Sequence, residues 1–436
     1  MTLIGKHIAI LGVGRSGRAA AALALREGAT VSAWDAAGPE AFVGMPEGVM
    51  IHPNATEEQG EKVFSDILVV SPGIDTYGSY VAAFSQKTGE VIGEVELAAR
   101  FYQGRIIGIT GTNGKTTTTE LVERVLSHAS LGGTACGNYG TPFAEVVLQS
   151  NPPPIVSLEL SSFQLETIRT LHPVVAIWLN FAPDHMDRYP TVEAYRAAKL
   201  RIFENQTADD TAVVRTGEKL PPIAARMVTF STTDDSADWF SDGHLVLHGG
   251  ETWLHMERDT SLRGLHNAEN TMAALAACEA LGISAAMMRE ALHGYAPPPH
   301  RCELIRTLDG VEYLNDSKAT NLHALESALR SQTRPVVLIA GGKEKGLDYS
   351  PVVPLLREKA LAAVTFGQIA RPLADLFSTA VSCESVSSLS DAVSVARSLA
   401  PRGSTILLSP GTSSFDQFTG YEQRGNAFRD LVHQLR

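Results

Sequence analysis

Short apolar runs alternate with alanine- and leucine-rich stretches along almost the whole chain. The runs at 7–11, 105–110 and 155–159 have the length and composition of buried strands, while residues 18–27 and 267–281 have helical spacing. Strands that alternate with helices in this way are typical of parallel sheets covered by helices on both faces. The pattern therefore predicts a doubly wound α/β fold.

Breaks in this rhythm suggest three domains, which suits a chain of 436 residues. We expect a Rossmann-like domain at 1–93, a central P-loop domain at 94–298 and a second Rossmann-like domain at 299–436. The Tyr-Ala-Pro-Pro-Pro string at 295–299 predicts a semi-rigid linker. In the least regular stretch, 225–256, three short apolar runs predict antiparallel strands.

Composition and charge exclude several classes of protein. Hydrophobic residues make up 44% and charged residues 19% of the chain, which is a globular composition. A formal net charge of −12 makes it a poor generic binder of nucleic acid. No run approaches the roughly 18 apolar residues of a membrane span. The four cysteines lie far apart, so we expect reduced thiols in a cytoplasmic protein.

A glycine-rich loop lies between the strand at 105–110 and a predicted helix. Backbone N–H groups of such a loop surround phosphate oxygens, and the helix N-terminus attracts negative charge. We expect Lys115 to reach the β- and γ-phosphates of ATP and the Thr116 hydroxyl to bind Mg²⁺. Ile109 stands where the strict Walker pattern has glycine, so the loop is a variant.

Three further residues carry candidate chemistry in the central domain. Glu159 ends the strand at 155–159, where a carboxylate either binds Mg²⁺ or caps a helix. His185 lies in a loop, where a histidine is more often a surface residue. Lys199 lies in a helical segment and, by pattern alone, is a solvent-exposed lysine.

Together these segments resemble the motifs of the Mur ligase superfamily, a group of ATP-dependent ligases that form amide bonds. The matching strings are TGTNGKTTT at 110–118, E-x-S-S-F-Q at 159–164, N-x-x-x-D-H-x-D at 180–187, Y-x-x-A-K at 195–199, H-N-x-x-N at 266–270, H-R-x-E at 300–303 and N-D-S-K-A-T-N at 315–321. The resemblance implies catalytic roles for Lys115, Glu159, His185 and Lys199. It also implies two Mg²⁺ ions, held by Thr116, Glu159, His185 and a carbamylated Lys199.

The ATP-binding set follows from the same resemblance. Asn267 and Asn270 share one helix face and could recognise a purine edge, although Asn267 could equally cap the helix. The residues implied to bind ATP are Gly111, Thr112, Asn113, Gly114, Lys115, Thr116, Thr117, Asn267, Asn270, Arg301, Asp316 and Lys318.

The N-terminal G-x-G-x-x-G turn at 12–17, followed by Asp35, suits either a dinucleotide or a uridine diphosphate. In the superfamily this domain binds the UDP end of the sugar substrate. The residues implied to bind the UDP-sugar are Gly14, Arg15, Ser16, Asp35, Ser71, Gly73, Asn138 and His185.

The two ends of the chain resemble the members of the superfamily that add D-glutamate. The strings are GVGRSGRA at 12–19, SPGI at 71–74 and LSPGTSSFDQFTGYEQRGNAF at 408–428. The resemblance implies UDP-N-acetylmuramoyl-L-alanine and D-glutamate as substrates, in cytoplasmic peptidoglycan precursor synthesis. It assigns D-glutamate to Thr320, Lys345, Ser414 and Tyr421, whereas pattern alone favours loop packing for the last two.

Three alternatives remain open at this point. A sister ligase would use another amino acid, an oxidoreductase would use the N-terminal turn for NAD, and a P-loop ATPase switch would explain the phosphate loop alone. Arg15 and Lys343 also depart from the residues usual in the D-glutamate-adding members. We expect a monomer that neither binds nucleic acid nor enters a membrane.

Overall fold

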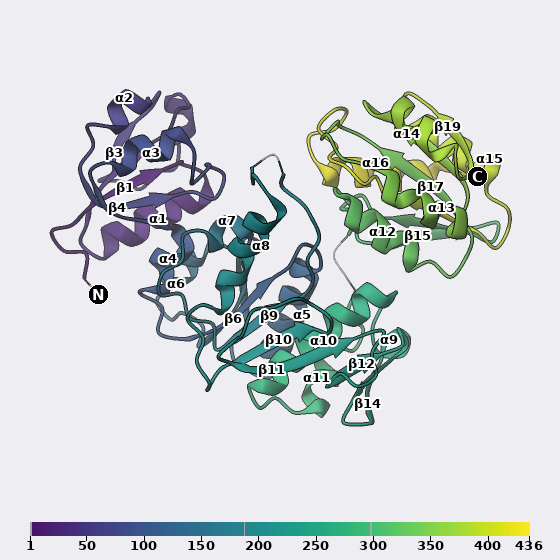
Figure 1. Ribbon diagram of the computed structural model, residues 1–436, viewed down its shortest axis with the longest axis horizontal. Coiled ribbons are helices and arrows are strands. Elements are labelled where there is room, and N and C mark those ends of the chain that lie inside the picture. Colours follow the sequence, from purple (N-terminus) through teal and green to yellow (C-terminus); the bar gives the residue numbers. More distant parts are fainter. Residues whose placement is uncertain (1, 187, 297–298) are drawn as a thin grey trace. The chain divides into compact units, whose positions relative to one another are not determined.

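The computed structural model describes residues 2–186, 188–296 and 299–436, and it confirms the α/β class (Figure 1). The strands form three sheets of five, nine and six strands. Contacts divide the chain into two units: one runs up to His255 and includes Glu269–His293, and the other comprises Met256–Ala268 and Gly294–Arg436. The domain limits expected after residues 93 and 298 stay predictions. Pro297 and Pro298 of the expected linker lie outside the described residues.

The first sheet is parallel throughout, in the order β3-β2-β1-β4-β5. Along β1, Ile8 and Ile10 enter one apolar cluster, while Ala9 and Leu11 enter another. Both faces are therefore buried, as the continuous apolar runs predict. The elements are β1 (His7–Leu11), α1 (Arg15–Arg26), β2 (Thr30–Trp34), η1 (Pro39–Phe42), β3 (Met50–His52), α2 (Glu57–Gly60), β4 (Ser65–Val70), α3 (Ser79–Ser85), β5 (Thr88–Gly93) and α4 (Glu94–Ala99).

Helix α1 begins at Arg15, three residues before the predicted start. Gly14 is its extended N-cap, so the chain enters the helix directly after the turn at Gly12. Gly17 lies inside the helix, and a Cβ there would come within 1.9 Å of the Gly12 carbonyl oxygen. This glycine therefore permits close packing of helix and turn, and does not extend the turn itself.

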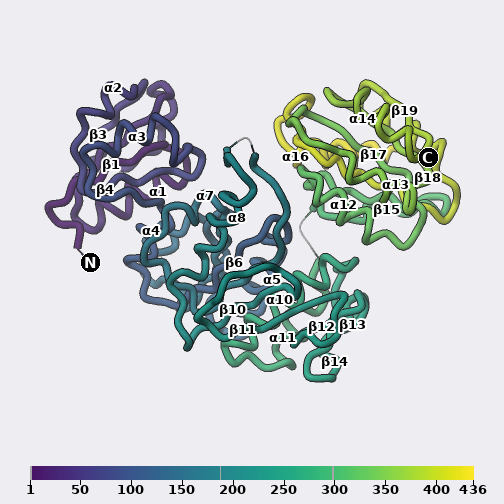
Figure 2. Tube along the Cα trace, in the orientation of Figure 1, coloured from purple at the N-terminus to yellow at the C-terminus, as the bar shows by residue number. Residues whose placement is uncertain are grey.

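The second sheet has the order β14-β13-β12-β11-β10-β9-β6-β8-β7. Its strands are parallel from β7 to β12, and only the β12–β13–β14 edge is antiparallel. The path of the chain through β6, β10, β11, β12, β13 and β14 can be followed by these labels in Figure 2. The elements are β6 (Arg105–Thr110), α5 (Lys115–His128), β7 (Thr134–Gly137), α6 (Phe143–Val147), β8 (Ile155–Glu159), α7 (Ser162–Leu165), β9 (Val175–Trp178), α8 (Val192–Leu200), η2 (Arg201–Phe203), β10 (Thr211–Arg215), β11 (Arg226–Ser231), β12 (Trp239–Ser241), β13 (Leu245–His248), β14 (Glu251–His255) and α11 (Ala285–Leu292).

The prediction of antiparallel strands across 225–256 was wrong for β11. This strand pairs in parallel with β10 on one side and β12 on the other. The antiparallel prediction holds for β13 and β14. A short apolar run does not encode the direction of its partner, because either pairing buries the same side chains.

The third sheet has the order β15-β16-β20-β17-β18-β19 and is antiparallel only between β15 and β16. Its strands are short apolar runs that alternate with helices, as the pattern along the chain predicts. The second unit contains α9 (Met256–Asp259), β15 (Glu303–Leu308), β16 (Val311–Asn315), α12 (Leu322–Arg330), β17 (Val336–Gly341), η3 (Ser350–Val352), α13 (Val353–Lys359), β18 (Ala360–Phe366), α14 (Ala370–Phe377), β19 (Ser382–Ser385), α15 (Leu389–Leu399), β20 (Thr405–Leu408) and α16 (Tyr421–Gln434), while α10 (Leu265–Ala280) contributes residues to both units.

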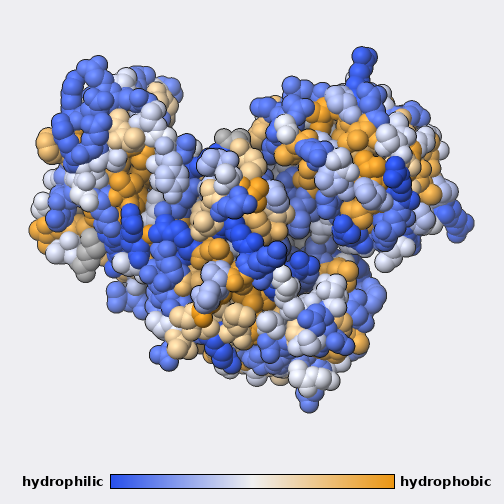
Figure 3. Space-filling model, in the orientation of Figure 1, coloured by the Kyte–Doolittle hydropathy of each residue, from blue (hydrophilic) through white to orange (hydrophobic). Residues whose placement is uncertain are grey.

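The surface carries mostly hydrophilic residues with apolar ones interspersed (Figure 3). Exposed apolar side chains such as Ile4, Phe64 and Tyr77 occur in the first sheet and its loops, and scattered residues of this kind are normal on a folded protein. Within the described residues, every helix is too short or too polar to cross a bilayer.

Glu94, at the start of α4, is a buried acid that should make stability depend on pH. It is 3% exposed and accepts a 2.6 Å hydrogen bond from the Ala144 N–H group. Burial, with a smaller contribution from Glu145, raises its pKa to about 7. The native protein therefore binds more protons than the unfolded chain between about pH 4.5 and 7, and stability falls as pH rises through that window.

We therefore expect Glu94→Gln to raise the free energy of unfolding by about 1–3 kcal/mol at pH 8, with little effect at pH 4.5. Urea denaturation at both pH values measures this difference. Glu145→Gln is the control, and its effect should be small. An equal effect of Glu94→Gln at both pH values would contradict the assignment.

Candidate active site

The phosphate loop lies between β6 and α5, in the predicted place. Gly111 and Gly114 have positive φ angles of 155° and 85°, which turn the backbone through the loop. A Cβ at Gly114 would lie 2.1 Å from the Asn270 side-chain oxygen, so glycine is required there. The N-cap residue of α5 is Gly114, which has no side chain to occupy the helix terminus, and a helix N-terminus of this kind suits an anion.

Neighbouring strands bring two further segments against this loop. In the sheet, β6 lies between β9 and β8, and all three are parallel, so their carboxyl ends meet at one edge. Beyond β9, Asn180 receives a 2.9 Å hydrogen bond from the Asn113 N–H group and donates one of 3.1 Å to its carbonyl. The Thr112 hydroxyl donates to the Ala182 carbonyl at 3.0 Å. The segment after β9 therefore holds the phosphate loop in place through these hydrogen bonds.

Glu159 reaches the same edge from the end of β8. It is 2% exposed, and its Oε1 accepts a 2.7 Å hydrogen bond from the Asn138 side-chain amide. Its Oε2 is buried and has no hydrogen-bond partner among the described residues. A buried carboxylate oxygen without a partner suits a cation, and a hard oxygen ligand suits Mg²⁺. The residues present therefore fit the expected metal.

Lys199 lies on α8 and is almost fully buried, at 2% exposure. The exposed lysine favoured by pattern alone was therefore wrong. Its ammonium donates to the Gly111 carbonyl at 2.8 Å, and Lys115 donates to the same oxygen at 2.9 Å. Burial, reinforced by the charge of Lys115, holds the pKa of Lys199 well below its usual value, while Asp184 and Glu159 oppose the shift.

His185 lies at the mouth of this site. Its φ angle of 56° is in the left-handed region, which non-glycine residues enter only at a cost and often at functional sites. The ring packs edge-on against Phe163 and Tyr195, at centroid distances of 4.9 and 6.0 Å. Tyr195 in turn lies 3.4 Å from Thr112. Asp187 of the same motif lies outside the described residues.

A magnesium site made only of acidic, histidine or cysteine side chains is not preformed. In the part of the chain that the structure describes, no three such residues cluster closely enough to hold a metal ion. Glu159 and His185 would therefore need additional ligands, such as the Thr116 hydroxyl, phosphate oxygens or a modified Lys199.

In the first sheet, the loops after β1, β2 and β4 lie together, and the binding roles expected for their residues stay predictions. The Asp35 carboxylate accepts hydrogen bonds from the N–H groups of Val13 and Ala37, at 3.0 and 2.9 Å. The Ser71 hydroxyl donates to the Gly12 carbonyl at 2.9 Å. Gly14, Arg15 and Gly73 are exposed beside them, and Ser16 is half-buried.

The candidate residues of the second unit gather near the start of α16. The Ser317 hydroxyl donates to the Tyr421 carbonyl at 2.8 Å, and the Lys318 ammonium lies 3.8 Å from the centre of the Tyr421 ring. Lys345 donates to the Thr320 carbonyl at 3.4 Å. Ser414 is buried in the preceding loop. Roles in binding D-glutamate or ATP stay predictions for these residues.

Asp316 occupies the interior of this unit. Its carboxylate accepts hydrogen bonds from the Ser409 hydroxyl at 2.9 Å and from the Cys302 N–H group at 3.2 Å. Burial raises its pKa to about 7, against the effect of these bonds and of Arg301. Among the other expected ATP contacts, Arg301 is half-buried and Asn267 donates to the Arg263 carbonyl at 2.9 Å.

Two arginines near these sites were not predicted to act. Arg424 is fully buried and donates to the carbonyls of Ser317 and Thr412, at 2.9 and 3.2 Å. Arg188 joins Glu166 to the Pro72 carbonyl. Arg424 stands inside a string that carries the family resemblance, and Arg188 directly follows one, which was the available signal. Nothing in a string indicates which side chains turn inward.

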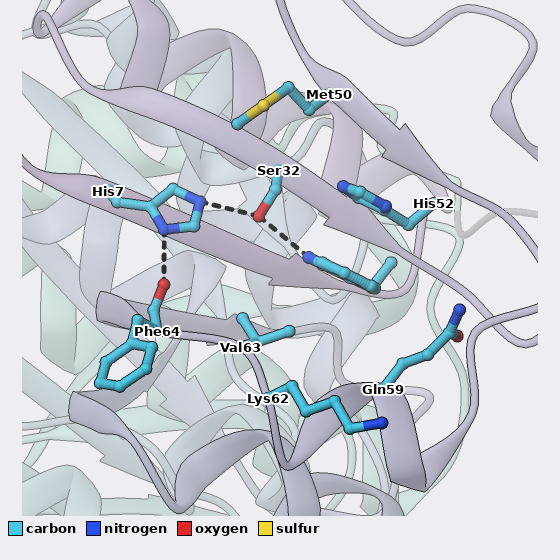
Figure 4. Close-up of a pocket in the computed structure, with 9 residues that line it drawn as sticks. His7, Ser32, Met50, His52, Gln59, Lys62, Val63 and Phe64 are labelled. Atoms are coloured by element: carbon cyan, nitrogen blue, oxygen red, sulfur yellow. Dashed lines mark hydrogen bonds between the residues drawn. The ribbon is translucent and has the colours of Figure 1, made fainter.

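A cavity of about 370 Å³ opens on the first sheet, away from these motifs (Figure 4). His7 lies 2.6 Å from the Phe64 carbonyl and 2.9 Å from the Ser32 hydroxyl, which also accepts from the Trp34 indole at 2.9 Å. Trp34 stacks on His52 at 3.7 Å. The polar groups at the centre of the cavity bond one another. The cavity is therefore a poorer candidate for the functional site than the phosphate-loop edge.

Comparison with known proteins identifies the family. Residues 109–278 match the Mur ligase middle domain, and residues 300–411 match the Mur ligase, glutamate ligase domain. The chain is 38% identical to the UDP-N-acetylmuramoylalanine–D-glutamate ligase of Myxococcus xanthus, covering 100% of both chains. It is 37% identical to the ligase of that name from Pelodictyon phaeoclathratiforme, covering 100% of this chain and 99% of the relative. The chain belongs to the Mur ligase family.

Solved structures of Mur ligases share the fold. The TM-score is 0.61 to a UDP-N-acetylmuramate–alanine ligase from Thermotoga maritima, at 18% identity, covering 98% of this chain and 99% of that chain. It is 0.62 to a MurF ligase from the same organism in complex with ADP, at 16% identity, covering 99% and 96%. The predicted family and ligase class are confirmed, and neither the NAD oxidoreductase nor the ATPase switch is supported.

Glu159→Gln tests the assignment of the unpartnered oxygen in this Mur ligase. The variant keeps the size of the side chain but removes the charge, so we expect Mg²⁺-dependent ATP turnover to fall at least about 100-fold. Thermal stability in metal-free buffer should stay the same or rise, because a buried charge is removed. Glu123→Gln is the control, because the native Glu123 carboxylate also accepts a hydrogen bond, of 2.8 Å from the Ala135 N–H group. Turnover within about 3-fold of the unmodified protein would exclude Glu159 as a metal ligand.

Proposed function

We propose that this Mur ligase adds D-glutamate to UDP-N-acetylmuramoyl-L-alanine and converts ATP to ADP and phosphate, in cytoplasmic peptidoglycan precursor synthesis. Full-length identity of 37–38% to relatives named for this reaction carries the substrate assignment. The phosphate loop, two lysines and an unpartnered carboxylate oxygen at one sheet edge support the chemistry. ATP dependence agrees with the loop between β6 and α5.

Two displacements account for the reaction. A carboxylate oxygen of the alanyl group attacks the γ-phosphorus of ATP, and the bond to the bridging oxygen breaks to release ADP. The amine nitrogen of D-glutamate then attacks the acyl carbon, loses a proton, and phosphate leaves with the electron pair of the broken C–O bond. The first step brings a carboxylate toward a triphosphate, so reducing repulsion is the main requirement.

The residues of the phosphate-loop edge suit that requirement. The loop N–H groups and the α5 terminus would hold the phosphates, and Lys115 would follow the negative charge on the γ-phosphate as it transfers. Mg²⁺, held by Thr116 and Glu159 with His185 and Lys199 at a second ion, would supply positive charge between the two anions. Asn138 bonds Glu159, which fixes the orientation of that carboxylate.

The lowered pKa of Lys199 supports its carbamylation. A neutral amine is the form that attacks carbon dioxide, and both burial and the neighbouring Lys115 favour that form. Formation of the N–C bond releases one proton and gives a carboxylate-like anion beside Lys115. Such an anion is a hard ligand for the second Mg²⁺.

Phosphate release tests the reaction. We expect release with ATP, Mg²⁺ and UDP-N-acetylmuramoyl-L-alanine to depend on D-glutamate, with L-glutamate, L-lysine and meso-diaminopimelate inactive. Dependence on one of the other amino acids would identify a sister ligase. Equal release without any amino acid would indicate a plain ATPase and refute the proposed ligation.

Carbon-13 NMR tests the modification separately. Protein equilibrated with ¹³C-bicarbonate near pH 8 should show a carbamate carbon resonance that is lost in Lys199→Arg, because the arginine is protonated and does not attack carbon dioxide. Lys219→Arg, at an exposed lysine, is the control and should keep the resonance. An identical spectrum for Lys199→Arg would refute carbamylation at this position.

A further inference from the structure

Arg188 connects two loops, the loop after β4 of the first sheet and the loop that carries His185. It lies in the loop between β9 and α8, close to His185. Its Nη1 donates to the Pro72 carbonyl at 2.8 Å, and its Nη2 donates to the Thr76 hydroxyl at 3.3 Å. Both partners belong to the loop after β4 of the first sheet. One guanidinium therefore connects the first sheet to the loop that carries His185.

The guanidinium also contacts Phe163 and Glu166, which lie in and directly after α7. Its Nη2 lies 3.0 Å from the Glu166 carboxylate, whose side chain is 1% exposed. The Tyr189 hydroxyl donates to the other oxygen of Glu166. The guanidinium also lies over the Phe163 ring, 3.9 Å from its centre. The arginine side chain is itself only 12% exposed, so packing and hydrogen bonds on several sides restrict its movement.

Phe163 connects this arrangement to the proposed active site. The same ring that carries the guanidinium packs against His185. A shift of Arg188 would thus alter both the Pro72–Thr76 loop and the packing of His185. The two effects would occur together, because they share one side chain and one ring.

We propose that Arg188 is a positioning residue for the UDP-sugar substrate. It holds the loop after β4, which includes Ser71 and Gly73, in register with the His185 loop. A substrate bound at its UDP end then presents its carboxylate toward the γ-phosphate. This inference rests on the proposed function, because it assumes that the substrate spans the two loops.

Arginine is required for this task by its shape. A planar fork bonds a carbonyl on one loop and a carboxylate on the other while its face packs on an aromatic ring. A lysine has one ammonium group at the end of a flexible chain and cannot reproduce all three contacts. The hydrogen-bond partners of Arg188 described above, Pro72, Thr76 and Glu166, all lie outside the phosphate loop, so we expect ATP binding not to depend on this arginine.

Calorimetric binding measurements on the full chain test the proposal. We expect Arg188→Met to weaken binding of UDP-N-acetylmuramoyl-L-alanine about 10- to 100-fold, and Arg188→Lys to weaken it less. Affinity for adenylyl imidodiphosphate with Mg²⁺ should stay within about 2-fold in both variants. Tyr189→Phe is the matched control: it removes another bond to Glu166 but leaves the bridge intact, so substrate affinity should change less than about 3-fold.

Two results would overturn the proposal. One is unchanged substrate affinity in both Arg188 variants. The other is an equal loss of substrate and nucleotide affinity, which a general structural role would produce. If Arg188→Met does not fold, Arg188→Lys and Glu166→Gln decide the question by the same two affinities. Failure of the unmodified protein to bind the UDP-sugar at all would instead refute the proposed function, and this inference with it.

Discussion

Three neighbouring strands of the second sheet, β9, β6 and β8, run in the same direction, and their carboxyl ends therefore meet at one edge. The phosphate loop, Glu159 and the segment beginning at Asn180 each follow one of these strands. Hydrogen bonds from Asn113 and Thr112 then attach the loop to the segment beyond β9. The composition of the site follows from this parallel pairing, since a reversed strand would carry its motif to the opposite edge.

At this edge two lysines and a buried carboxylate lie near one another. Lys115 and Lys199 share the Gly111 carbonyl, while one buried oxygen of Glu159 has no partner among the described residues. Such an arrangement costs stability, because burial disfavours each charged form. The arrangement agrees with the proposed function, in which a bound cation would give the Glu159 oxygen the partner that it lacks. The lowered pKa of Lys199 is a direct consequence of the arrangement.

The fold class and most strands could be predicted, because buried parallel strands give continuous apolar runs. Predictions from the sequence were wrong where contacts with segments distant in the chain decide the structure. The direction of β11 depends on its partners, and the start of α1 depends on how closely Gly17 packs on the Gly12 turn. Lys199 was assigned to the surface by pattern alone, since its burial comes from what packs against α8. Family resemblance directed attention to that lysine, but only the structure shows its contact with Gly111.

By itself, the sequence determined the order of strands and helices, the glycines that form the phosphate loop, and the family, because these depend on local pattern and on motif spacing. Tertiary structure decided which motif residues meet, which charges are buried and which side chains join separate loops. Arg188 is an example: the sequence shows only a basic residue directly after the motif at 180–187, while its contacts with Pro72 and Glu166 exist only after residues far apart in the chain have packed together. Burial and proximity are properties of the folded chain, and they set the chemistry of the side chains that the sequence supplies.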